Sequence, residues 1–100
     1  MYTQFTSQQA DKILVTANSE YHMRDTTCIG VRHRRSGKWQ TEHLAQGAQL
    51  VAAMQPTDNG SWCVNMGMPG PGQRMYFDND VLTSALEEVI DAEAPAPLAA

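Results

Sequence analysis

The fold is decided by residues 48–68, AQLVAAMQPTDNGSWCVNMGM. Apolar side chains recur at every second position from Ala48 to Met54, and again from Trp62 to Met68. A period of two is typical of a β-strand with one buried face. The intervening PTDNG, residues 56–60, is dense in residues that form turns. We therefore predict a hairpin of strand 48–55 with strand 61–68.

A second hairpin is predicted over residues 27–44. TTCIGVRHRR carries β-branched residues at 27, 29 and 31, and Ser36-Gly37 follows as a turn before a second strand at 39–44. A three-residue loop would set Arg32 opposite Glu42, whereas a two-residue loop would set Arg34 beside Trp39. The sequence leaves this register open.

Two more extended segments complete the predicted sheet. Residues 13–23 alternate throughout, which predicts one strand, bent or bulged near Asn18 and Ser19. Residues 74–77 resume an extended, aromatic-rich pattern after the stiff loop PGPG at 69–72. Short strands at this spacing favour a mainly β fold, a small curled antiparallel sheet or barrel of five to six strands.

The last segment, residues 81–91, has two interpretations. Leu82, Leu86, Val89 and Ile90 recur at helical spacing behind Asp80 as a possible N-cap, so a short C-terminal helix is the local preference. The short DND turn at 78–80 could equally fold a final strand back onto residues 74–77.

The totals predict one small domain. One hundred residues with 42% hydrophobic content allow a single core, so we expect residues 1–91 to form one β domain and the Ala/Pro-rich residues 92–100 a flexible tail. Without an apolar leader or a membrane-length apolar run, the chain is expected in the cytoplasm and away from membranes. Cys28 and Cys63 are expected to be free thiols.

A basic hairpin tip is the candidate binding site. The net charge is −4, yet five of the seven basic residues lie between positions 24 and 38. From Asp78 onward, by contrast, all the charged residues are acidic. These acids could meet a basic partner or neutralise the protein's own arginines. A hairpin tip exposes charge to carboxylates or phosphates, and a tryptophan beside it can anchor a partner. The predicted binding residues are Arg32, Arg34, Arg35, Lys38 and Trp39.

Sequence motifs for catalysis or metal binding are weak. The three histidines and two cysteines show no C-x-x-C or H-x-x-x-H spacing, and a curled sheet this small has little depth for a catalytic pocket. We therefore expect no catalytic residues, no metal and no cofactor.

The function expected from these features is binding without catalysis. The first hypothesis is a small protein-interaction module or regulatory subunit that uses the basic hairpin, with a possible homo-oligomer through an exposed edge strand. The alternative is a small β-barrel that binds nucleic acid or another polyanion through Arg24 and the basic residues of the hairpin. A third, less favoured hypothesis is a small hydrolase or thiol enzyme, which would need a histidine close to Cys28 or Cys63, or a carboxylate pair in a cleft.

Overall fold

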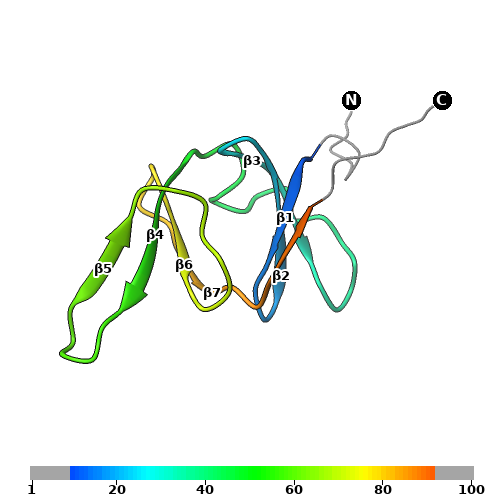
Figure 1. The fold of residues 1–100 in the computed structure, drawn as a ribbon. Helices are drawn as coiled ribbons and strands as arrows, with labels where there is room; N and C mark the ends of the chain where they lie inside the picture. Colours follow the sequence, from blue (N-terminus) through cyan, green and yellow to red (C-terminus); the bar gives the residue numbers. More distant parts are fainter. Residues whose placement is uncertain (1–9, 92–100) are drawn as a thin grey trace.

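Every regular element of the structure is a β-strand. The computed structural model describes residues 10–91, which form two four-stranded antiparallel sheets and contain no helix, hence none able to cross a membrane (Figure 1). The first sheet has the order β3-β2-β1-β8 and the second the order β5-β4-β6-β7. The strands are β1 (Lys12–Val15), β2 (Ser19–Arg24), β3 (Thr27–His33), β4 (Leu50–Pro56), β5 (Trp62–Asn65), β6 (Arg74–Phe77), β7 (Leu82–Ala85) and β8 (Glu88–Asp91). The mainly β prediction is confirmed, and the two sheets do not close into a barrel.

The second sheet is formed by a segment that lies, in sequence, between strands β3 and β8 of the first sheet. Strands β1, β2 and β3 form a meander, the chain then makes β4 to β7, and β8 returns to pair with β1. In Figure 1 the β4–β5 hairpin extends away from the first sheet, at the side opposite to β1 and β2. We call this hairpin, residues 50–65, the arm.

The hairpin predicted over residues 48–68 is confirmed. Strands β4 and β5 pair antiparallel with Met54 opposite Val64 and Pro56 opposite Trp62. The turn closes where the Thr57 amide donates to the Ser61 carbonyl at 2.9 Å. Gly60 has φ +87, a left-handed conformation that glycine adopts without steric cost. The alternation and the turn residues thus determine this element locally.

The single strand predicted over residues 13–23 is in fact two strands, β1 and β2. The bend expected near Asn18 is a complete reversal that places Leu14 opposite Tyr21. The Thr16 amide donates to the Ser19 carbonyl at 2.9 Å, and the Thr16 hydroxyl oxygen accepts from the Ser19 amide at 3.3 Å. A threonine hydroxyl that satisfies a turn amide stabilises a reversal that the alternation pattern does not reveal.

The strand predicted at residues 39–44 does not form, and neither proposed register occurs. A single bridge joins Arg32 to Trp39. Beyond it the chain turns, with the His43 amide donating to the Gln40 carbonyl. The His43 ring packs edge-on against Tyr21, with centroids 5.5 Å apart. This side-chain packing draws the segment onto the first sheet instead of leaving it extended.

The helix predicted over residues 81–91 was wrong, and the alternative of a final strand was correct. Strand β7 folds back onto β6 with Leu82 opposite Tyr76, and β8 pairs with β1 with Ile90 opposite Ile13. Two sheet pairings therefore override the helical spacing. The predicted tail at 92–100 lies outside the described residues.

The core lies between the two sheets. Leu14, Met23 and Val31 come from the first sheet, and Met75 and Phe77 from the second; all five are fully buried. The Phe77 ring stacks on Tyr21 with centroids 6.3 Å apart. Contacts of this kind join the sheets into one packed unit.

Candidate functional site

Arg32 and Trp39 of the predicted basic site lie side by side at the end of β3. The Arg32 Nε donates to the Gly37 carbonyl at 3.0 Å, and its Nη1 lies 3.5 Å from Glu20 Oε1. Gly37 has φ +72, and a side chain there would approach the Arg32 guanidinium to 3.1 Å. Arg32 therefore stabilises its own turn, which limits its capacity to bind a partner.

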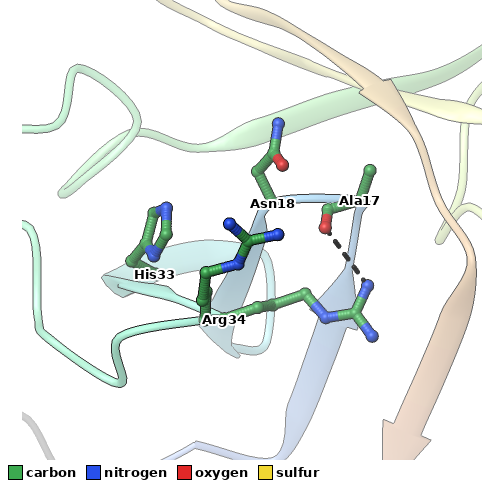
Figure 2. A pocket seen from close by; sticks show the side chains of 5 residues that line it. Ala17, Asn18, His33 and Arg34 are labelled. Carbon is green, nitrogen blue, oxygen red and sulfur yellow. Dashed lines mark hydrogen bonds between the residues drawn. The ribbon is translucent and has the colours of Figure 1, made fainter.

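Arg34 ties three segments of the chain together. Its Nη1 donates to the Thr16 carbonyl at 2.8 Å and to Glu87 Oε1 at 2.8 Å, and it lies 3.4 Å from the Ala17 carbonyl (Figure 2). The guanidinium thus joins the end of β3 to the β1–β2 turn and to the chain before β8. One of the C-terminal acids therefore neutralises the basic hairpin from within the molecule.

Arg35 and Lys38 are the exposed remainder of the predicted site. Within residues 10–91 neither forms an ion pair with an acid. Arg35 lines a shallow depression of about 500 Å³, which Ala17, Asn18, His33 and Arg34 complete (Figure 2). Lys38 is not among the residues lining it. The structure thus leaves two free cations in this region, too few for a continuous basic surface.

Arg24, included in the polyanion alternative, lies far from the other arginines along the hairpin. It pairs with Thr27 beside the β2–β3 turn, whereas His33 pairs with Ser19 at the opposite end of the same strands. The basic residues that cluster in sequence are therefore divided between two ends of the first sheet. A nucleic acid, whether duplex or single strand, would therefore find a shorter continuous row of cations to contact than the sequence predicts.

A surface that sequence reasoning missed lies on the second sheet. Opposed residues of antiparallel strands point to the same side, and the register places nine side chains on the side away from the core, which we call the outer face. They are Ala52, Met54, Pro56, Trp62, Val64, Arg74, Tyr76, Leu82 and Ala85. Trp62 is 43%, Val64 52% and Leu82 40% exposed.

This outer face departs from the usual pattern of a solvated sheet. An antiparallel sheet with one wet face generally carries polar residues there, whereas eight of these nine are apolar or aromatic. Arg74 stands 5.6 Å over the Trp62 ring, a cation–π geometry, and the Tyr76 hydroxyl donates to Asp80. The Tyr76 hydroxyl thus already has a partner within the molecule. A contiguous apolar surface of this kind is a mark of an interaction site.

A sequence signal for this surface exists in the distribution of charge. Between residues 50 and 73 the only charged residue is Asp58, in the turn at the tip of the arm. Edge strands that must stay unpaired usually carry lysine, proline or a bulge. Strand β5 has none of these, and all four of its residues are exposed. The segment is therefore unprotected against pairing with another chain.

The two thiols are in opposite environments, and both are free. Cys28 is buried and its Sγ lies 3.6 Å from the Gly30 carbonyl. Burial raises the pKa of Cys28 to about 11, which suppresses the nucleophilic thiolate. Cys63 is exposed on β5. Within residues 10–91 no histidine is hydrogen-bonded to either thiol, and no group of three or more His, Cys, Asp or Glu gathers as metal ligands.

His22 is a buried base beneath Trp39. The two ring centroids are 4.7 Å apart, and His22 Nε2 lies 3.2 Å from Glu20 Oε1. The buried Nδ1 has no hydrogen-bond partner, as expected if Nε2 carries the proton and donates to the carboxylate. Burial lowers the pKa of His22 below 6.5, outweighing the opposing effect of Glu20.

This histidine predicts acid sensitivity of the fold. Because the unfolded state binds the proton more readily than the folded state, the free energy of unfolding should fall as the pH drops below 6.5 and towards the lower folded pKa. The variant His22→Phe keeps an aromatic ring and should lose part of this pH dependence. Some dependence should persist because burial also lowers the pKa of His43. Urea unfolding at several pH values checks this, and identical pH dependence in both proteins would contradict it.

Comparison with known proteins gives no match to this chain: no family model, no curated protein and no solved structure is similar to it.

Proposed function

We propose that this domain is a non-catalytic protein-interaction module that binds its partner through the arm and the outer face of the second sheet. The observation that carries the proposal is the exposure of Trp62 and Val64 on a strand with no charged residue. Tryptophan is enriched among the residues that dominate binding energy at interfaces. Arg74 over its ring restricts the indole before binding, which lowers the entropy lost on association.

The basic hairpin takes a secondary role in this proposal. Arg32 and Arg34 already bind acids of the same molecule, so the hairpin offers mainly Arg35 and Lys38 for contact. Such charges at the rim of an interface steer encounter more than they hold a complex together. A polyanion as the principal ligand is less well supported, because the arginines are divided between two ends of the first sheet. We further propose a cytoplasmic setting, supported by two thiols that remain unpaired.

The test compares photocrosslinking from two surfaces in the cells that make the protein. p-Benzoylphenylalanine would replace Met66, the exposed residue next to β5, or Arg35 in the basic hairpin. We expect an adduct of one defined mass from position 66 and little from position 35. Adding Trp62→Ser should weaken the position-66 adduct about tenfold, as expected for loss of an interface anchor.

The matched control is Leu44→Ser, which changes an apolar residue that is 74% exposed but lies outside the outer face. With Leu44→Ser added, the amount of the position-66 adduct should equal the amount formed without this substitution. Adducts from position 35 alone would move the binding site to the basic hairpin. If neither position yields a specific adduct, the proposed interaction function is wrong.

A further inference from the structure

The backbone of β5 offers an open hydrogen-bonding edge at two residues. The Thr57 amide donates to the Ser61 carbonyl, and bonded pairs alternate with non-bonded pairs along an antiparallel ladder. Cys63 and Asn65, opposite Gln55 and Ala53, therefore direct their amides and carbonyls towards β4. The amides and carbonyls of Trp62 and Val64 point the other way, to the free edge.

Pro56 supports this assignment. It lies opposite Trp62 in the register and has no amide hydrogen to donate. A proline is tolerated there because the alternation turns its nitrogen away from β5. The two residues with open backbone groups are also those whose side chains lie on the outer face, so one short strand combines an open edge with an apolar surface.

The other sheet edges are less open to pairing. The edge of β3 is partly covered by the bridges of Thr27 to Gln49 and Arg32 to Trp39. The edge strand β8 begins with Glu88 and ends with Asp91. The edge strand β7 is flanked by Asp80 and Glu87. Asp91 and Glu87 are ion-paired with Lys12 and Arg34, but within residues 10–91 Glu88 and Asp80 form no ion pair. These two acids oppose the approach of a second copy to the edges of β8 and β7, whereas β5 has no charge to repel it.

We propose that the occupant of the arm is a second copy of this chain, paired antiparallel through β5 about a two-fold axis at Cys63. This inference rests on the proposed function and names the partner for the same surface. A two-fold axis requires open residues to pair with open residues. An axis at Cys63 pairs Trp62 with Val64 of the second copy, and both lie inside β5.

Neighbouring registers place some of their hydrogen-bonded pairs outside β5. An axis at Val64 would pair Trp62 with Met66, which lies beyond the end of β5, and an axis at Trp62 would pair Val64 with Gly60 in the turn. The register centred on Cys63 is the one that keeps all of its bonded pairs within β5. It also sets an indole against a β-branched side chain on the outer face, a favourable cross-strand pair.

The register makes a sharp geometric prediction. The two Cys63 residues would form a non-bonded pair with their Cα atoms roughly 4.5 Å apart, within the separation that a disulfide spans. The two Asn65 residues would lie on opposite sides of the axis and well apart. Cys63 thus reports the register without any new residue, while Cys28 is buried and shielded from oxidant.

The experiment oxidises the full chain with copper–phenanthroline and resolves the products on non-reducing gels. We expect a covalent dimer from the unsubstituted chain, and none from Cys63→Ser or from Cys63→Ser/Asn65→Cys. A dimer from Cys63→Ser/Asn65→Cys, without one from the unsubstituted chain, would overturn the register and with it the proposal. Circular dichroism on each variant checks that the sheets remain.

Sedimentation velocity under reducing conditions tests the association itself. Val64→Pro removes an amide that points to the free edge and spares the β4 ladder, and each dimer would lose two hydrogen bonds. We expect the dissociation constant to rise about tenfold or more. The matched control Leu44→Lys changes an apolar side chain that is 74% exposed and lies outside the outer face, and it should leave the dissociation constant unchanged.

The outcomes separate this inference from the proposed function. A monomeric protein whose position 66 still captures a different protein would overturn the second copy as occupant and leave the interaction function standing. A monomer with no arm adduct would overturn both. A dimer unaffected by Val64→Pro would overturn pairing through β5.

Discussion

Replacing Phe77 by alanine is expected to lower the free energy of unfolding by about 3–5 kcal/mol. Phe77 is fully buried in β6 and stacks on Tyr21 of β2, so its ring is a principal contact between the two sheets. Removing it takes away the transfer free energy of a large aromatic side chain and leaves a cavity that two hydrogen-bonded sheets cannot easily close. The total free energy of unfolding of a small domain is only about 5–15 kcal/mol, so the variant should be partly unfolded near body temperature.

Urea unfolding followed by tryptophan fluorescence gives the measurement. Phe77→Leu is the graded variant and should cost clearly less, because most of the volume remains. Leu44→Ala is the surface control, since that side chain is 74% exposed, and it should change stability by no more than about 0.5 kcal/mol. Similar losses from Phe77→Ala and Leu44→Ala would contradict the two-sheet core.

Thr83→Val is expected to cost about 1–3 kcal/mol although the two side chains have nearly the same shape. The β6–β7 register shifts between Arg74 and Tyr76, and this irregularity interrupts the ladder at Met75. The buried Thr83 Oγ1 accepts from the Met75 amide at 3.0 Å and donates to the Ser84 carbonyl at 2.8 Å. Valine would leave the Met75 amide without a partner.

The control is Thr83→Ser, which keeps the hydroxyl and removes only a methyl group. It should therefore retain most of the stability that valine loses, as measured by the same urea titration. Hydrogen exchange at the Met75 amide gives an independent measurement, because exchange there should speed up in the valine variant beyond the global change. If serine costs as much as valine, the hydroxyl is not the essential group.

The sequence predicts the elements whose information is local. Residues 48–68 combine alternation with the turn PTDNG, and the structure contains the hairpin that these features indicate. Within residues 81–91, strand β7 pairs with the neighbouring β6 through the DND turn, the local alternative that the sequence offers. The partner of β8 is remote, because Ile90 pairs with Ile13 at the other end of the described chain. Helical spacing of apolar residues is a weak preference that two ladders of backbone hydrogen bonds outweigh.

The candidate site shows the same limit. A row of arginines in the sequence indicates exposed positive charge, but Glu20 meets Arg32 through the β2–β3 register and Glu87 reaches Arg34 only through the tertiary fold. The outer face was detectable in part, because residues 50–73 contain one charge. Its location required the register of four strands, which sets Trp62, Val64 and Leu82 on one side of the sheet.

The pairing of β1 with β8 has a consequence for biosynthesis. Lys12 lies opposite Asp91, and their side chains form an ion pair at 2.7 Å. The first sheet therefore cannot be completed until Asp91 has left the ribosome, whereas the β4–β5 hairpin needs only neighbouring residues. During translation the nascent chain could therefore contain the folded β4–β5 hairpin while one edge of β1 still has no partner strand. A chaperone would protect the chain most at this stage, before the distant contacts form.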